Sequence, residues 1–250
     1  DDDPYELFLQ SVKAHRRLLT GFGGHPSVPR EKWLDAQDPK HVAISLNGEP
    51  TLYSRLGEFL DICHQHGVST FLVTNGSLPK VIEKLDTLPT QLYVSVDAPN
   101  KEIFDRICKP KFDQSAFEKL EQTLELLPSL DTRTVCRHTL IKGESLGHWK
   151  DYARLDNIAD PDFIEAKGHI YVGNSQSNHT IENMPSHDEV MDFSRNLAPL
   201  VGREVLSDRR ESRVALIGKE MIPVTLPTKI RDLPKDLGIA KPQKFTLPQL

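Results

Sequence analysis

The sequence predicts an α/β barrel, and three observations lead to this fold class. Short apolar runs alternate along the chain with amphipathic stretches at helical spacing. Most of these apolar runs end in polar turns that contain glycine, and strand, turn and helix form the repeating unit of such barrels. The length of 250 residues, with 38% hydrophobic and 27% charged residues, suits one globular domain of barrel size.

The chain begins with a predicted helix from residue 4 to about residue 20. Acidic residues at 1–3 and Pro4 mark its start, and apolar residues recur at helical spacing until a glycine-rich turn ends it. Residues 25–39 contain three prolines and Trp33. We expect an irregular linker with one short helix there, which would cover one end of the barrel.

The stretch 41–52, HVAISLNGEPTL, organises the rest of the chain. It predicts a strand at 42–46 that ends in a polar elbow. Within the elbow, Gly48 lets the backbone approach a ligand closely, and Pro50 stiffens the turn. Glu49 follows Asn47 and Gly48 and places a carboxylate where barrel enzymes carry their chemistry. From these residues alone, an ordinary turn with an exposed glutamate is equally open.

Two further units follow with the same pattern. A helix is predicted at 52–66, and a strand at 69–73 ends in Thr74 and Asn75. After a helix at 78–88, the strand 91–96 brings Ser95 and Asp97 onto one face, because side chains alternate along a strand. An inward face rarely carries such a pair unless it serves a ligand. The alternative is that both residues cap a loop.

Predicted helices and strands continue to alternate as far as the last predicted strand. A tail at 219–250 contains five prolines and little periodicity, so we expect it to be extended or disordered. The predicted elements between are a helix at 101–107, a loop at 108–111, an amphipathic helix at 115–127, a strand at 132–141, a helix at 146–158, a strand at 162–166 and a strand at 213–217.

A long polar loop at 169–186 lacks core periodicity, and loops of this length are usually functional or mobile. We expect it to lie over the barrel mouth, with Tyr171 and Asn183 near the substrate. Ser186 is the predicted N-cap of the next helix, and Glu189 completes a capping box.

Lysines end two successive strands, at Lys142 and Lys167. They would make the barrel mouth positive, which suits a carboxylate or a phosphate. The alternative is that each lysine pairs with a nearby glutamate, such as Glu144 or Glu165.

Composition restricts the class of protein. No apolar stretch is long enough for a membrane span, and three scattered cysteines favour a reducing cytoplasm over a disulfide framework. The net charge of −5 does not indicate nucleic-acid binding. Local basic groups do occur, and they are 15–17, 109–111, Arg203, Arg209, Arg210 and Arg213.

The elbow resembles the glycine-glutamate-proline motif of radical S-adenosylmethionine (SAM) enzymes, which ends the second barrel strand and holds the amino group of SAM. A longer series of segments is more specific. AISLNGEPTLY, FLVTNGSLP, QLYVSVDAP, TLIKGESL, DFIEAKGHIYVGNSQ and ENMPSHDEV occur in this order. Together they resemble the tRNA 4-demethylwyosine synthases, over about residues 2–218.

The resemblance implies a partial (β/α)6 barrel of the radical SAM type at 1–218, without its first strand. It implies a carbon-carbon lyase that converts N1-methylguanosine beside the anticodon of tRNA into 4-demethylwyosine, with pyruvate, SAM and an electron donor. A reduced four-iron four-sulfur cluster would split SAM, and the resulting radical would remove hydrogen from the N1-methyl group. The implied cofactor residues are Asn47, Gly48, Glu49, Pro50, Thr74, Asn75, Ser95 and Asp97. We expect a monomer.

The cysteines depart from the family pattern. Radical SAM enzymes carry a C-x-x-x-C-x-x-C loop that holds the cluster, and the spacing of Cys63, Cys108 and Cys136 cannot form it. We expect no metal ligands in these 250 residues and regard the chain as a C-terminal portion of the enzyme, with its cluster ligands upstream of Asp1. The catalytic residues stay unassigned, and this portion alone is expected to be inactive.

Two other classes stay open. The chain could be a cluster-less relative that only binds tRNA or a protein partner. It could also be an unrelated barrel enzyme that acts on a small anion, in which case the elbow is coincidental.

Overall fold

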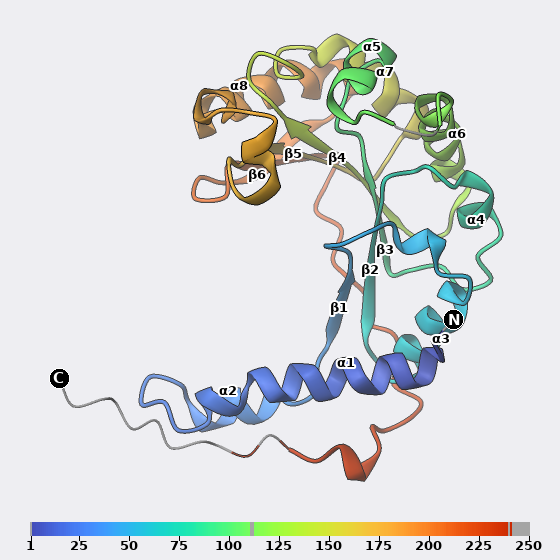
Figure 1. The fold of residues 1–250 in the computed structure, drawn as a ribbon, viewed down its shortest axis with the longest axis vertical. Coiled ribbons are helices and arrows are strands. Elements are labelled where there is room, and N and C mark those ends of the chain that lie inside the picture. The colour runs from blue at the N-terminus through green and yellow to red at the C-terminus, as the bar shows by residue number, and fades with distance from the viewer. Residues whose placement is uncertain (1, 111–112, 240, 242–250) are drawn as a thin grey trace.

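The computed structural model describes residues 2–110, 113–239 and 241, and a curved seven-stranded sheet forms its centre (Figure 1). The strand order is β1-β2-β3-β4-β5-β7-β6. Strands β1 to β5 are parallel, whereas β7 runs antiparallel to β5, and β6 runs antiparallel to β7. The strands are β1 (His41–Ile44), β2 (Ser69–Thr74), β3 (Gln91–Ser95), β4 (Arg133–Leu140), β5 (Phe163–Gly168), β6 (Glu204–Arg209) and β7 (Val214–Gly218).

Helices cover the outer, convex face of the sheet and leave its concave face open (Figure 1). Among the described residues, no helix is both long and apolar enough to cross a membrane. The α-helices are α1 (Pro4–Leu18), α2 (Arg30–Asp35), α3 (Leu56–Gln65), α4 (Pro79–Glu83), α5 (Lys101–Ile107), α6 (Ala116–Leu126), α7 (Trp149–Ala159) and α8 (His187–Leu197). Short 3₁₀ helices are η1 (Thr20–Phe22), η2 (Pro50–Leu52), η3 (Leu127–Ser129), η4 (Gly173–Ser177), η5 (Ile181–Asn183), η6 (Ala198–Val201) and η7 (Lys235–Leu237).

This arrangement confirms the predicted fold class, a partial barrel of alternating strands and helices. The five parallel strands follow each other in sequence and in space, which is the order of a barrel wall. Strand β1 pairs with β2, and no other described strand pairs with its free edge. The sheet therefore begins at an edge where a complete barrel has a further strand.

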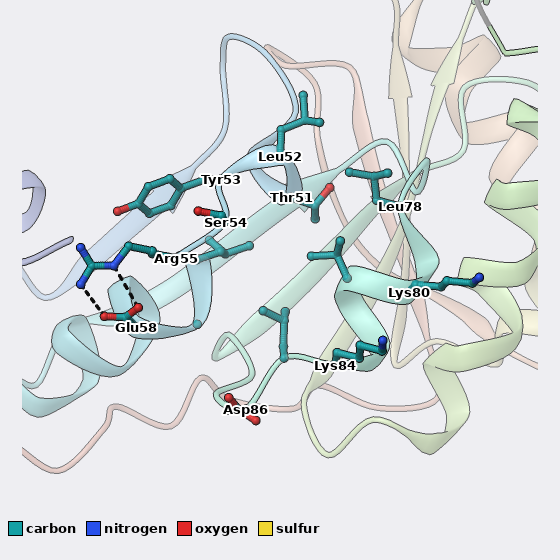
Figure 2. A pocket seen from close by; sticks show the side chains of 14 residues that line it. Thr51, Leu52, Tyr53, Ser54, Arg55, Glu58, Leu78, Lys80, Lys84 and Asp86 are labelled. Carbon is teal, nitrogen blue, oxygen red and sulfur yellow. Dashed lines mark hydrogen bonds and ion pairs between the residues drawn. The ribbon is translucent and has the colours of Figure 1, made fainter. Parts of the chain in front are cut away.

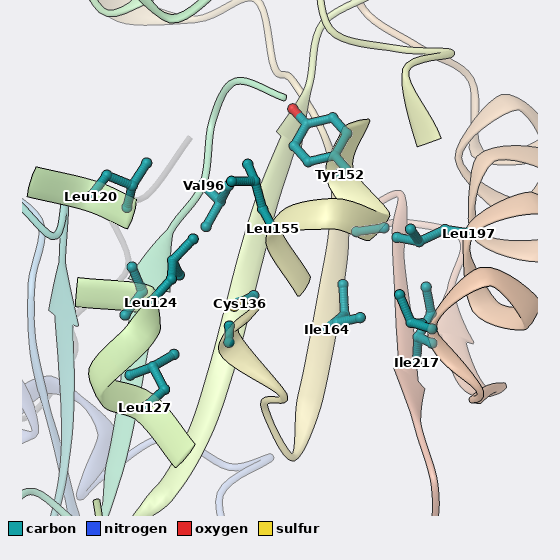
Figure 3. Packing of buried hydrophobic residues seen from close by; sticks show 14 of the residues in the cluster. Val96, Leu120, Leu124, Leu127, Cys136, Tyr152, Leu155, Ile164, Leu197 and Ile217 are labelled. Carbon is teal, nitrogen blue, oxygen red and sulfur yellow. The ribbon is translucent and has the colours of Figure 1, made fainter. Parts of the chain in front are cut away.

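The main core lies between the outer face of the sheet and helices α6 to α8 (Figure 3). Alternate residues of each strand point into it, for example Val94 on β3, Cys136 on β4 and Ile164 on β5, all 0% exposed. Leu120 and Leu155 meet them from α6 and α7. Each buried aliphatic side chain contributes about 1.5–3 kcal/mol to the packing of the helices on this face of the sheet.

The concave face carries the polar side chains of the same strands. In the register, Arg137 lies between Ser95 and Glu165. Two residues further along the same strands, Thr139 pairs with Lys167. The Arg137 guanidinium donates to Glu165 Oε1 at 2.8 Å, and its carbon lies 4.5 Å from the ring centre of Tyr93. Polar groups therefore gather on the inner wall of the partial barrel.

Several boundaries differ from the sequence prediction, and each difference has a local cause. The helix predicted at 52–66 begins at Leu56, because Pro50–Leu52 form η2 and the backbone of Tyr53 is extended. The helix predicted at 78–88 is reduced to α4. Strand β6 was not predicted, because its residues are mostly exposed and show no alternation of apolar and polar side chains.

Helix α8 begins as predicted. Ser186 Oγ accepts a hydrogen bond from the Glu189 amide at 3.2 Å, and Glu189 Oε2 accepts one from the Ser186 amide at 2.8 Å. This reciprocal pair confirms the capping box and satisfies two amides that the helix itself leaves unpaired.

The chain after β7 runs extended under the first helices (Figure 1). Gln65 O accepts hydrogen bonds from the amides of Ile230 and Arg231 at 2.8 and 2.9 Å. Leu233 and Leu237 pack against a small apolar cluster formed by α1, α3 and β1. The described part of the predicted tail is thus held by specific contacts, and the rest of 219–250 lies outside the described residues.

Candidate functional site

A cavity of about 800 Å³ lies at the carboxyl ends of β2, β3 and β4. One wall comes from the strand ends and the other from α5, α6 and the loop between them. The strand-end wall contains Asn75, Ser95 and Asp97, which the sequence predicted as cofactor residues, together with Thr139. Three of the eight predicted cofactor residues therefore line one cavity, and the elbow with Thr74 lies beside it.

Glu49 joins this elbow to the end of β2. Its Oε1 accepts hydrogen bonds from the Thr51 amide at 3.1 Å, the Thr51 hydroxyl at 2.6 Å and the Thr74 hydroxyl at 2.7 Å. Its Oε2 accepts one from the Asn75 amide at 2.8 Å. The carboxylate therefore holds two strand ends together, and Oε2 keeps room for one further donor.

The other elbow residues are open to solvent. Asn47 and Gly48 are exposed, and Pro50 is half-buried at the start of η2. Gly48 has φ of +81°, in the left-handed region that favours glycine, and no atom lies within 4 Å of the position of an added Cβ. Leu46 also has a positive φ, of 93°, and its side chain is fully exposed. The elbow thus stands free beside the cavity.

The turn after β2 depends on Gly76. Its φ is +72°, in the region that favours glycine, and an added Cβ would lie 2.8 Å from Leu120 Cδ1 and displace that side chain. Thr123 Oγ1 donates to Gly76 O at 2.7 Å from α6. This tight packing places the exposed side chain of Asn75 at the cavity wall.

Asp97 and Thr139 meet at the inner end of the cavity. Burial raises the pKa of Asp97, while a hydrogen bond from the Thr139 side chain opposes this shift. Ser95 lies two residues earlier on the same strand and is half-buried. The strand end therefore offers acceptor and hydroxyl groups that can bind the polar groups of a ligand.

The sequence did not predict the wall formed by α5 and α6. It contains Phe104, Ile107 and Ala116 as apolar residues, with Asp113 and Lys119 at its edge. Lys119 Nζ lies 2.6 Å from Asp113 Oδ2, and this hydrogen bond lowers the pKa of Asp113 to about 2. No local motif identifies this wall, because α6 is brought opposite the strand ends only by its packing on the sheet.

The two predicted lysines have different surroundings. Lys142 Nζ lies 2.6 Å from Glu189 Oε1, so its partner is the capping-box glutamate and not Glu144. Lys167 is half-buried on the concave face, and among the described residues its ammonium has no ion-pair partner, because Glu165 pairs with Arg137. Of the two, Lys167 is the cation that is available to an anionic ligand.

The loop 169–186 is anchored at both ends. The His169 amide donates to Leu140 O at 2.9 Å, and Asn183 Nδ2 donates to Lys142 O at 2.9 Å. Asn183 Oδ1 accepts from the Thr180 amide at 2.8 Å, so this side chain already stabilises the loop. Tyr171 is half-buried between these anchors. The proximity of Tyr171 and Asn183 to a substrate stays a prediction.

The three cysteines do not form an iron–sulfur site. Cys63 lies in α3 and Cys136 in β4, and both side chains are 0% exposed. Cys108 lies at the cavity wall, where burial of its thiol raises the pKa to about 12 although the residue as a whole is exposed. No group of three metal-ligating residues occurs in the part of the chain that the structure describes.

A second hollow, of about 610 Å³, lies between η2, α3 and α4 (Figure 2). Arg55 on one side pairs with Glu58 at 2.7 Å, and Lys80 and Lys84 lie on the other side. It contains none of the predicted cofactor residues, and it shares only Leu52 and Leu78 with the strand-end cavity. The strand-end cavity is therefore the candidate site.

Comparison with known proteins identifies the family of the chain. The sequence profile of the radical SAM superfamily matches residues 22–155, and a profile described as wyosine base formation matches residues 158–219. The chain is 42% identical over 223 residues to the SAM-dependent tRNA 4-demethylwyosine synthase of Pyrococcus abyssi, covering 88% of this chain and 65% of that protein.

This chain covers a larger share of two further relatives. The corresponding enzyme of Methanocaldococcus jannaschii is 39% identical over 220 residues, covering 88% of this chain and 69% of that protein. A solved structure of TYW1 with a lysine–pyruvate adduct bound superimposes with a TM-score of 0.79 at 36% identity, covering 87% of this chain and 70% of that one. The chain therefore belongs to the radical SAM superfamily and, within it, to the tRNA 4-demethylwyosine synthase family.

Proposed function

We propose that this chain is the barrel part of an enzyme that converts N1-methylguanosine beside the anticodon of tRNA into 4-demethylwyosine. The observation that supports this most is the shared cavity of Asn75, Ser95, Asp97 and Thr139 at three successive strand ends. In a radical SAM barrel, polar groups at the strand ends are where cofactor and substrate meet. The chain spans 65% of the Pyrococcus abyssi relative, so the activity belongs to the proposal for the whole enzyme.

Membership of the superfamily implies two cofactors, SAM and a four-iron four-sulfur cluster. The residues present fit SAM, because the cavity offers hydroxyl, carboxylate and apolar groups around a space of sufficient size. SAM supplies the deoxyadenosyl group that starts the radical reaction. Within this chain, Ser95 and Asp97 would hold its polar groups, Asn75 would close the cavity above β2, and the elbow from Asn47 to Pro50 would meet its amino group.

The cysteines do not fit the cluster, because two are buried in separate elements and the thiol of the third has a raised pKa. We therefore place the cluster ligands of the whole enzyme outside these 250 residues. This misfit is also what favours the second candidate, a relative that binds tRNA or a protein partner without a cluster. The family membership excludes the unrelated barrel enzyme.

Pyruvate is the proposed co-substrate, since the related TYW1 structure holds a lysine–pyruvate adduct. Lys167 would bind an anionic group at the mouth, because its half-buried ammonium has no ion-pair partner among the described residues. Lys142 is less available while Glu189 holds it at 2.6 Å. We assign the enzyme to the carbon-carbon lyases.

The remaining proposals concern the setting of the enzyme. Three free cysteines agree with the reducing cytoplasm. We also propose that the enzyme is a monomer and that it receives electrons from a separate donor.

The function is tested with the whole enzyme, reconstituted anaerobically with iron and sulfide. With SAM, dithionite, pyruvate and tRNA that contains N1-methylguanosine, we expect 4-demethylwyosine in the digested tRNA by mass spectrometry. The 250-residue chain, treated in parallel, is expected to form neither this base nor 5′-deoxyadenosine, because its cysteines cannot hold a cluster. If the whole enzyme binds tRNA but makes no product, the cluster-less relative is the better description.

A second prediction concerns the loop 169–186. We expect it to close on the anticodon loop, with the Tyr171 ring stacked on an unstacked base. Replacing Tyr171 with alanine is therefore expected to reduce turnover of the whole enzyme more than it reduces the free energy of unfolding. Hydrogen exchange between the two anchors should slow when tRNA is added, while exchange in α7 should not change.

High protection of the loop without tRNA, together with full turnover of Tyr171→Ala, would show instead that the loop is a rigid structural insertion. Phe22→Ala is a control, because Phe22 is an exposed aromatic residue of η1 and does not line the strand-end cavity.

A further inference from the structure

The β6–β7 hairpin brings three arginines to the rim of the barrel mouth. Strand β7 runs antiparallel to β5, so Val214 at its start lies opposite Lys167 near the end of β5. Arg209 at the end of β6 pairs with the same Val214. The turn between the two strands, residues 210–213, therefore lies at the carboxyl ends of the parallel strands, on the same rim as the candidate site.

The backbone of Arg213 holds an unusual conformation in this turn. Its φ is 49°, in the left-handed region where glycine or asparagine is the ordinary choice. The Gly168 amide donates to Arg213 O at 2.8 Å, which fixes the turn against the end of β5. This hydrogen bond holds Arg213 at the rim, beside the end of β5.

Two of these three arginines line an open hollow of about 480 Å³. Arg210, Arg213 and Lys142 line it, beside His187 and Pro185. The hollow lies next to the end of β5, where Arg213 O accepts from the Gly168 amide, and the loop 169–186 contributes Ile181 and Met184 to its lining.

The ion pairs around the hollow leave positive charge available. Arg210 pairs with Asp188 at 2.8 Å, but both side chains are at least 68% exposed, so water screens the pair and a stronger anion can replace it. Lys142 is held by Glu189. Arg213 is half-buried, and no ion pair of its guanidinium occurs among the described residues. A guanidinium presents a planar set of donors that suits phosphate oxygens.

We propose that the tip of the β6–β7 hairpin, with Arg213 as its main contact, binds phosphates of the RNA substrate that flank the target nucleotide. This rests on the proposed function, which brings an RNA loop to the mouth. The target base has to leave the stack and enter the cavity, while its neighbouring phosphates stay outside at the rim. Positive charge at the rim, in a chain with net charge −5, directs the RNA to this side of the molecule.

The test uses the whole enzyme and a labelled anticodon stem-loop RNA that carries N1-methylguanosine. Arg213→Gly removes the guanidinium, and glycine accepts the backbone conformation without strain. We expect its affinity at low salt to fall by roughly three- to tenfold, and the plot of log affinity against log salt to become shallower by about one. Arg213→Asn should behave in the same way, because asparagine also tolerates this φ.

The control is Arg195→Ala. Unlike Arg213, Arg195 is exposed and paired with Asp192, and it lies near the other end of α8, away from the hairpin. Its replacement is expected to leave both affinity and salt dependence unchanged. Thermal melting checks that all variants are folded, and we expect the glycine variant to melt no lower than the original chain.

Unchanged affinity and salt dependence in both Arg213 variants would overturn the proposal. It is also overturned if these variants lose affinity for a polyglutamate peptide but not for RNA, since the surface would then serve an acidic protein. If the original enzyme forms 4-demethylwyosine and only this result is negative, the proposed function stands. If the original enzyme does not bind the RNA, the proposal and the proposed function both fail.

Discussion

Replacing Glu49 with glutamine is expected to weaken SAM binding of the whole enzyme by roughly 1–3 kcal/mol, the range for loss of a hydrogen bond to a charged group. Glutamine has the same size but carries an amide in place of one carboxylate oxygen. All four groups that Glu49 contacts in the chain are donors, three to Oε1 and one to Oε2. Whichever way the amide turns, it faces at least one donor, so the elbow loosens from the end of β2.

The measurement is a calorimetric titration of the whole enzyme with SAM, next to urea unfolding of the same variant. Glu58→Gln is the matched control, because Glu58 is a half-exposed glutamate of α3 that pairs with Arg55 at 2.7 Å, away from the cavity. We expect the control to bind SAM normally. An unchanged SAM affinity in Glu49→Gln would contradict a role of the elbow at the cofactor. A lower unfolding free energy with unchanged affinity would limit Glu49 to joining the two strand ends.

The largest effect on stability is expected from Asp156→Ala. Asp156 on α7 lies 2.9 Å from His138 Nε2 on β4, and both side chains are 0% exposed. The other ring nitrogen of His138 lies 3.2 Å from Val96 O and donates to it, because a carbonyl can only accept. Without the aspartate, Nε2 stays buried with no partner, and breaking a buried pair of this kind costs about 3–5 kcal/mol.

Urea unfolding followed by circular dichroism measures this loss, with Asp192→Ala as the control. Asp192 belongs to an exposed pair with Arg195, so its removal should change the unfolding free energy by less than about 0.5 kcal/mol. A similar small change for Asp156→Ala would mean that water or a neighbouring group replaces the carboxylate. Asp156 itself does not line the strand-end cavity.

Elements with short-range signals were predicted close to their observed positions. Helix α6 follows from apolar residues every three or four positions, and the start of α8 follows from the capping box of Ser186 and Glu189. The strand ends that carry Asn75 and Asp97 were also recognised, because a polar turn after an apolar run is visible in a few residues. In each case the residues that stabilise the element lie within one or two turns of each other along the chain.

What depended on distant partners could only be seen in three dimensions. Periodicity along the chain cannot show that Lys142 pairs with Glu189 while Lys167 has no partner among the described residues, or that β6 folds back along β7 and brings Arg213 to the rim. The four donors around Glu49 come from the elbow and from the neighbouring strand 25 residues away. Sequence by itself determined the barrel class and the positions of the strand-end turns, because local hydrogen bonds and apolar periodicity specify them. Only the tertiary structure decided which side chains meet at the mouth, because the packing of helices on the outer face of the sheet brings separate strand ends together.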